Sequence, residues 1–221
     1  KRKRAKNLIP QMSISETQAS LLKEIGSSLD NGLTRDEASK RRQEDGSFNV
    51  VSPPVDCPAW ICCLLPCIKS IPSMKAFRQI QPEDAEVLRE GKWIRYDAAS
   101  LVRGDIIKLE EGDIVPADCV ILTMEEDEML VDVKTVTGED KPRSIQILDG
   151  FAPPIKLFYG GLVLQGSGQA VVTATGPGTL LAKLIQQKKF PPQENILEAN
   201  DIIDDVDAGI SLITHTDEHI V

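Results

Sequence analysis

Two adjacent carboxylates, Glu139 and Asp140, are the first residues of this sequence whose types and spacing could do chemistry. They stand in a short polar segment, residues 137–142, in which Gly138 frees the backbone to project and Pro142 stiffens the exit. Paired negative charges attract Lys, Arg or Mg²⁺ and repel a phosphate group that is not shielded. The segment is therefore expected to be an exposed loop with an acidic tip that suits insertion into a cleft.

The residues just before this loop predict a strand that fixes its base. Val131 and Val133 alternate with Asp132 and Lys134, which is the period-2 pattern of a half-buried strand. The loop is thus expected to rise from a rigid support.

The cysteines form the second group of reactive side chains. Cys119 stands alone, and the other four cluster in one short segment: Cys57, Cys62, Cys63 and Cys67. An odd count with one cluster is not the disulfide framework of a secreted protein, so we expect reduced thiols and a cytosol-facing chain. The cluster could ligate zinc, although its spacing is not the usual pair of pairs. It could instead be S-acylated, with Trp60 and Ile61 helping a peripheral membrane anchor.

Charge narrows the possible partners. The chain of 221 residues has 25 Lys and Arg against 34 Asp and Glu, a net charge of −9, which argues against nucleic-acid binding because phosphates would be repelled. Residues 193–221 contain eight acidic residues and no Lys or Arg, which suggests an acidic tail or a partner-binding strip. His215 and His219 in this tail could share one helix face, but we assign no metal site to them.

Helical spacing marks the region from residue 13 to 46. Apolar residues from Leu21 to Leu29 recur at helical intervals, and Asn31-Gly32 is expected to stop that helix. Thr34 fits the N-cap of a second short helix, with Glu37 as its capping-box partner.

Short apolar runs bounded by turn residues follow, and they predict a mainly β fold, a sandwich or distorted jelly roll. The predicted strands contain Ile106–Leu109, Cys119–Leu122, Met129–Val131, Leu162–Leu164 and Ala170–Thr173. Leu180 to Lys189 predicts a helix that ends before Pro191-Pro192. Asp105, Asp113 and Asp118 are interpreted as turn or loop-bracing residues.

These patterns divide the chain into five segments. They are a basic mobile arm (1–12), a helical segment (13–46), a Pro- and Cys-rich link (47–73), a β domain (74–190) and an acidic tail (191–221). No apolar run reaches 18 residues, so no ordinary membrane-spanning helix is expected, and the chain is expected to be soluble or peripheral on a membrane.

Three ordered blocks of the β region resemble the actuator domain of P-type cation-transporting ATPases. They are Val87–Trp93 with Leu101–Ile107, Glu111–Asp118, and Val131-Asp132 followed by Thr137–Pro142. The resemblance covers about residues 75–186, and the segment around Gly32–Ala38 resembles the amino-terminal part of the same pumps. The proton-pump and calcium-pump branches are the most similar.

The resemblance implies a distorted jelly-roll or double-stranded β-helix-like domain whose Thr-Gly-Glu loop enters the site of an aspartyl phosphate. Glu139 would orient the attacking water and accept its proton, Gly138 would allow close approach, and Thr137 would brace the loop. Asp132, Asp140, Lys141 and Pro142 would support the loop. The resemblance also implies that Mg²⁺ and ATP belong to other domains of the family, and that the partner is a pump's phosphorylation domain or another assembly.

The departures from the family pattern keep three functional hypotheses open. No Asp-Lys-Thr-Gly-Thr motif occurs in the 221 residues, Asp140 stands where the family has Ser, and the link replaces a pair of membrane helices, so the cysteine cluster could be a remnant of one. The chain is expected to be a regulatory or binding module, part of a cation pump that supplies Glu139, or a membrane-surface scaffold. A simple exposed turn at residues 137–142 is the alternative to any chemistry. The 221-residue chain by itself is expected not to hydrolyse ATP.

Overall fold

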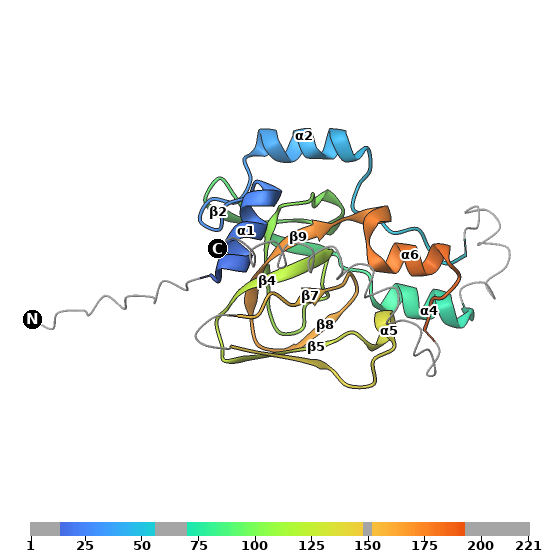
Figure 1. Cartoon of the computed structure of the whole chain (residues 1–221). Coiled ribbons are helices and arrows are strands. Elements are labelled where there is room, and N and C mark those ends of the chain that lie inside the picture. Colours follow the sequence, from blue (N-terminus) through green and yellow to red (C-terminus); the bar gives the residue numbers. More distant parts are fainter. Residues whose placement is uncertain (1–13, 56–69, 148–151, 193–221) are drawn as a thin grey trace, which may run out of the picture.

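The computed structural model describes residues 14–55, 70–147 and 152–192 (Figure 1). Within these residues, nine strands form two sheets, and five α-helices lie around them, which confirms the mainly β fold class. The larger sheet has the order β2 (Lys92–Asp97), β1 (Asp84–Arg89), β3 (Ile106–Leu109), β9 (Gly168–Ala174), β4 (Asp118–Met124) and β7 (Lys156–Leu157). The smaller sheet has the order β6 (Arg143–Gln146), β5 (Glu128–Asp132) and β8 (Leu162–Gln165).

The main core lies between the two sheets. It contains Ile107 and Ile121 from the larger sheet and Met129, Val131 and Ile145 from the smaller one, all fully buried. In β5 the buried residues alternate with partly exposed ones, as expected for a strand with one face against a core. The predicted strands match β3, β4, β5, β8 and β9, whereas β1, β2, β6 and β7 were not among them.

Helix α1 (Glu16–Ile25) covers the outer face of the larger sheet, where Leu22 and Ile25 pack against Val120 and Val171. It ends at Ile25 because Gly26 adopts a left-handed conformation (φ 69°) and donates its N–H to the last carbonyl groups. The predicted stop at Asn31-Gly32 was therefore wrong.

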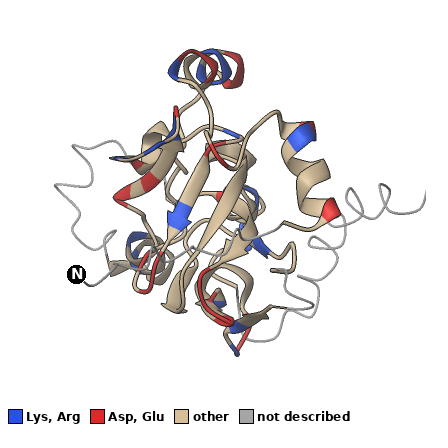
Figure 2. Ribbon diagram, turned by 90° about the vertical axis from the view of Figure 1, so that its left-hand side faces the viewer, with Lys and Arg blue, Asp and Glu red and all other residues tan. Residues whose placement is uncertain are grey.

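Helix α2 (Arg35–Asp45) has the predicted capping box: Glu37 N–H donates to the Thr34 hydroxyl at 3.2 Å, and Thr34 N–H donates to the Glu37 carboxylate at 2.8 Å. Its surface carries both signs of charge, as the uppermost helix in Figure 2 shows. Only Ala38 of this helix is buried. The helix is connected to the β domain by Arg41, whose guanidinium donates to the Arg103 carbonyl at 2.8 Å.

Three helices gather at one end of the β domain: α4 (Pro72–Gln79), α5 (Lys134–Thr137) and α6 (Leu180–Gln186) (Figure 1). They share an apolar cluster that includes Phe77, Val136 and Leu181. Helix α6 is shorter than the predicted 180–189, because Lys188 has a positive φ of 59°. In the described part of the chain, no helix is both long and apolar enough to cross a membrane.

Candidate functional site

The Thr-Gly-Glu segment connects β5 to β6, whose pairing places Val131 opposite Arg143. The chain does not continue as a strand through Val133, as the alternating pattern had suggested, but turns into α5. Asp132 starts this turn, since its carboxylate accepts the Lys134 N–H at 2.8 Å. At the other end Gly138 has a left-handed φ of 80°, which favours glycine.

Exposure is not uniform along the predicted loop. Thr137 is buried, and its hydroxyl donates to the Val133 carbonyl at 3.1 Å, so this residue belongs to the base of the loop. Gly138 and Glu139 are partly exposed, whereas residues 140–142 are exposed. The expectation of an exposed loop over all of 137–142 therefore holds only for its second half.

A bidentate ion pair holds the side chain of Glu139. The Arg143 guanidinium donates from Nη2 to Oε1 at 2.6 Å and from Nε to Oε2 at 3.0 Å. Burial alone would raise the pKa of Glu139, but the hydrogen bonds and charge of Arg143 outweigh it, so that the pKa lies below its usual value. Glu139 is therefore a carboxylate at neutral pH.

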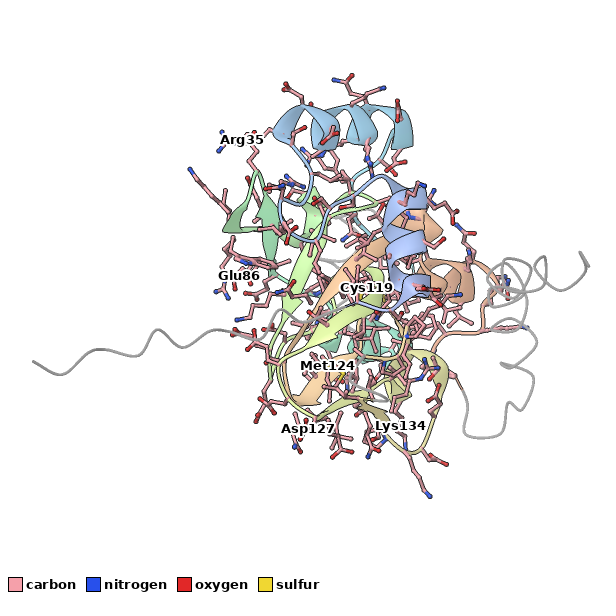
Figure 3. The ribbon with its side chains drawn as sticks, turned by 60° about the vertical axis from the view of Figure 1, so that its left-hand side comes forward. Arg35, Glu86, Cys119, Met124, Asp127 and Lys134 are labelled. Carbon is pink, nitrogen blue, oxygen red and sulfur yellow. The ribbon has the colours of Figure 1, made fainter. Side chains whose placement is uncertain are left out.

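The second carboxylate has its own cation. Lys134 Nζ lies 3.3 Å from Asp140 Oδ1, and both side chains are largely exposed, at 51% and 76%. Figure 3 labels Lys134 on the same edge of the ribbon as the loop. Such an exposed pair contributes little to stability, about 0–1 kcal/mol, but it partly neutralises the charge of Asp140.

The back of the loop contacts the segment that follows α6. A Cβ added at Gly138 would lie 3.1 Å from Pro192 Cβ, which is tighter than an ordinary contact. Space and backbone conformation together explain why glycine stands between Thr137 and Glu139. Lys141 and Pro142 lie on the exposed outer side of the turn.

Asp118 braces the end of the domain that carries this loop. Its two carboxylate oxygens accept the Tyr159 N–H at 2.9 Å and the Leu180 N–H at 2.7 Å, which links β4 to the start of α6. The interpretation as a loop-bracing residue is confirmed. Burial raises the pKa of Asp118 to about 6, despite the opposing effect of the two backbone hydrogen bonds.

This raised pKa predicts a pH-dependent stability. The folded protein holds a proton on Asp118 between about pH 4 and 6, whereas the unfolded chain does not, so stability from this group is lost as pH rises through about 6. The full change is at most about 3 kcal/mol, at 1.36 kcal/mol per pKa unit. Urea unfolding of wild type and Asp118→Asn at pH 4.5 and 7.5 should show this difference only in wild type. Equal pH dependence in both proteins would contradict it, and Asp84→Asn is the exposed control.

The other two predicted aspartates, Asp105 and Asp113, brace turns as expected, but Asp105 also forms a buried ion pair that the sequence did not suggest. Asp113 accepts the Glu110 N–H at 2.8 Å, and Asp105 accepts the Val102 N–H at 2.9 Å. Asp105 in addition forms a fully buried ion pair with Arg89, with Nη2 to Oδ2 at 2.6 Å. Sequence reasoning missed this pair, because Arg89 reads as an ordinary polar residue at the end of a strand.

The remaining candidate sites give no metal centre within the described residues, where no group of three or more His, Cys, Asp or Glu could hold an ion. Cys119 is buried in β4, as Figure 3 shows, and burial raises the pKa of its thiol far above neutrality. It is therefore not a reactive nucleophile. The cluster Cys57, Cys62, Cys63 and Cys67, the arm 1–12 and the histidines of the acidic tail lie outside the described residues.

Comparison with known proteins agrees with this geometry. Residues 79–189 match the family model of the P-type ATPase actuator domain. The chain therefore belongs to the P-type ATPase family through this domain, as its sequence blocks suggested.

Two individual proteins are similar to parts of this chain, which spans less than a quarter of the length of either. Over 158 residues it is 34% identical to "Calcium-transporting ATPase 1" of Schizosaccharomyces pombe, and the match covers 66% of this chain and 17% of that protein. The crystal structure of a zinc-transporting PIB-type ATPase in the E2.Pi state is similar with a TM-score of 0.43 and 21% identity, over 64% of this chain and 23% of that one.

Proposed function

We propose that the loop around Glu139 supports hydrolysis of an aspartyl phosphate in a P-type cation transporter. The observation that carries this proposal is the position of Glu139. In a domain of this family, its carboxylate is ionised and partly exposed, directly after the Thr137-Gly138 turn. Glu139 would bind a water molecule beside the phosphoryl group and accept its proton as the water oxygen bonds to phosphorus. The bond from phosphorus to the aspartate oxygen breaks, which releases phosphate and a free carboxylate.

The charges of the loop are compatible with this role. Glu139 and Asp140 would repel a phosphoryl group if both were unpaired, but each has a cation close by, Arg143 and Lys134 respectively. The repulsion that the sequence alone suggested is thus reduced by two cations that flank the loop. Mg²⁺ and ATP would be bound by other domains of the transporter.

A domain exchange tests the proposal. Residues 79–189 replace the matching segment of the S. pombe calcium-transporting ATPase, and the chimaera is phosphorylated with labelled ATP and then chased with unlabelled ATP. We expect a phosphoenzyme that decays at least tenfold faster than one in which residues 137–139 are all changed to Ala. Equal decay of the two chimaeras would refute the proposal, because phosphorylation itself reports that the other domains are folded.

A binding module acting in trans is a second possible function. The 221 residues contain no phosphorylation motif, so if they act as a separate polypeptide, the aspartyl phosphate must be on a partner. Incubation with labelled ATP and Mg²⁺ should then leave the isolated chain unlabelled, and affinity purification with mass spectrometry should recover a P-type ATPase. Acid-stable label on the chain would contradict this.

The cysteine cluster allows a third possibility, a cytosol-facing scaffold at the membrane surface. S-acylation of Cys57, Cys62, Cys63 and Cys67 would anchor the chain through thioesters. Flotation of the native protein with liposomes should then be lost after hydroxylamine treatment. If the protein still floats with the liposomes after hydroxylamine treatment, S-acylation does not anchor it to the membrane.

A further inference from the structure

Arg143 makes contacts that go beyond closing the loop. Its Nη1 donates to the Lys156 carbonyl at 3.0 Å, and the centre of its guanidinium lies 5.1 Å from the centroid of the Phe158 ring. Lys156 is in β7 of the larger sheet, and Phe158 belongs to the apolar cluster shared with α4, α5 and α6. The guanidinium is therefore held from two sides by groups that do not include Glu139.

These two contacts fix the Arg143 side chain independently of Glu139. A side chain already fixed by a carbonyl group and an aromatic ring loses little further freedom when it binds a carboxylate. Its remaining Nε and Nη2 atoms form the planar edge that matches a carboxylate with two parallel hydrogen bonds. Only 22% of the Arg143 side chain is exposed, against 36% for Glu139, so the fixed partner is the more buried one.

The ion pair also leaves one carboxylate oxygen of Glu139 able to accept a further hydrogen bond. Oε1 of Glu139 accepts hydrogen bonds from both Nη2 and Nε, at 2.6 Å and 3.2 Å, whereas Oε2 accepts one, at 3.0 Å. A carboxylate oxygen has two lone pairs, so Oε2 keeps acceptor capacity on a partly exposed side chain. The oxygen that could take a proton from water is thus held at a defined position.

We propose that Arg143 is a positioning residue, which fixes the Glu139 carboxylate so that its Oε2 atom can receive the attacking water; this inference rests on the proposed function. Other charged groups on the elements around the loop are Asp132 at the end of β5, Lys134 on α5, Asp140 and Lys141 in the turn, and Lys156 on β7. Among these, Lys134 is paired with Asp140. Arg143 is the cation in direct contact with Glu139.

The first test measures the ionisation of Glu139 in the full 221-residue chain. The side-chain carboxyl signal of Glu139 is followed by NMR during a pH titration of wild type, Arg143→Met and Arg143→Lys. We expect the pH at which Glu139 is half ionised to rise in Arg143→Met. It should rise by a smaller amount in Arg143→Lys, because Lys keeps the positive charge but not the planar pair of donors of the guanidinium. The matched control is Arg95→Met, which removes an exposed ion pair to Asp84 on the far edge of the larger sheet and should leave the midpoint unchanged.

The second test measures phosphoenzyme decay against pH in the chimaera. Arg143→Met should slow decay on the order of tenfold at neutral pH and move the acid limb of the profile upward, with partial recovery in Arg143→Lys. A purely structural role would lower the amount of folded protein without moving the acid limb. If Glu139→Gln slows decay but Arg143→Met and Arg143→Lys keep the wild-type rate and profile, the positioning role is wrong and the proposed function stands. If Glu139→Gln has no effect, both are wrong.

Discussion

Replacing Glu139 with Gln is expected to slow decay of the phosphorylated chimaera by about 100-fold, which corresponds to about 2.7 kcal/mol in the activation barrier. Gln has nearly the same shape, and it can still accept one hydrogen bond from Arg143. It cannot take a proton from water, so the substitution removes the general base while the fold is kept. The decay is measured by quenching samples in acid after a chase with unlabelled ATP.

Asp140→Ser is the matched control for this experiment, because it removes the neighbouring carboxylate and introduces the residue that the family has at this position. Asp140 is 76% exposed and contacts only Lys134 among the ion pairs described. We expect decay within about threefold of wild type, as for other exposed pairs. If the phosphorylated Glu139→Gln and Asp140→Ser chimaeras decay at the same rate, residues 137–142 form a turn that takes no part in the hydrolysis.

Removing Asp105 is expected to have the largest effect on stability. Arg89 and Asp105 are 6% and 0% exposed, and two hydrogen bonds of 2.9 Å and 2.6 Å join them. Asp105→Ala would leave the Arg89 guanidinium buried without its counter-charge, which costs about 3–5 kcal/mol of unfolding free energy. It would also remove the acceptor for the Val102 N–H. Urea unfolding of the 221-residue chain, followed by tryptophan fluorescence, measures the change.

Two variants show whether burial causes this effect. Arg35→Ala breaks an exposed pair with Glu90, in which the side chains are 68% and 47% exposed, and should cost less than about 1 kcal/mol. The double variant Arg89→Met/Asp105→Leu removes both charges and should be more stable than Asp105→Ala, because no unpaired charge remains. A loss of less than 1 kcal/mol in Asp105→Ala would contradict the importance of the pair.

Local signals in the sequence determined much of this protein. The capping box of Thr34 and Glu37 depends on residues three apart, so it could be predicted from the sequence. The same holds for β3, whose limits Ile106–Leu109 match the apolar run. Several ordered blocks also identified the family, and with it the candidate residues Thr137, Gly138 and Glu139.

The exact course of the loop was not predictable in the same way. Alternation of Val131 and Val133 is typical of a strand, yet Asp132 accepts the Lys134 N–H and starts a helical turn instead. When a side chain accepts a backbone N–H that would otherwise bond to the neighbouring strand, the strand can end at that residue. The alternating pattern therefore predicted correctly that Val133 is buried, although this residue precedes a helical turn and is not part of a strand.

Only the tertiary structure decided which partners the charged residues have. Glu139 and Arg143 are only four residues apart, but it is the turn between the paired strands β5 and β6 that brings them together. Arg143 is in turn fixed by Lys156 and Phe158, which lie in a separate part of the chain. Arg89 meets Asp105 because β1 and β3 are neighbours in the larger sheet. The contact between Arg89 and Asp105 depends on the register and order of the strands, which are set by burial of a whole apolar face rather than by residues close to either charge in the sequence. The sequence therefore determined which residues could do chemistry, whereas their charge state and exposure follow from strand pairing and burial.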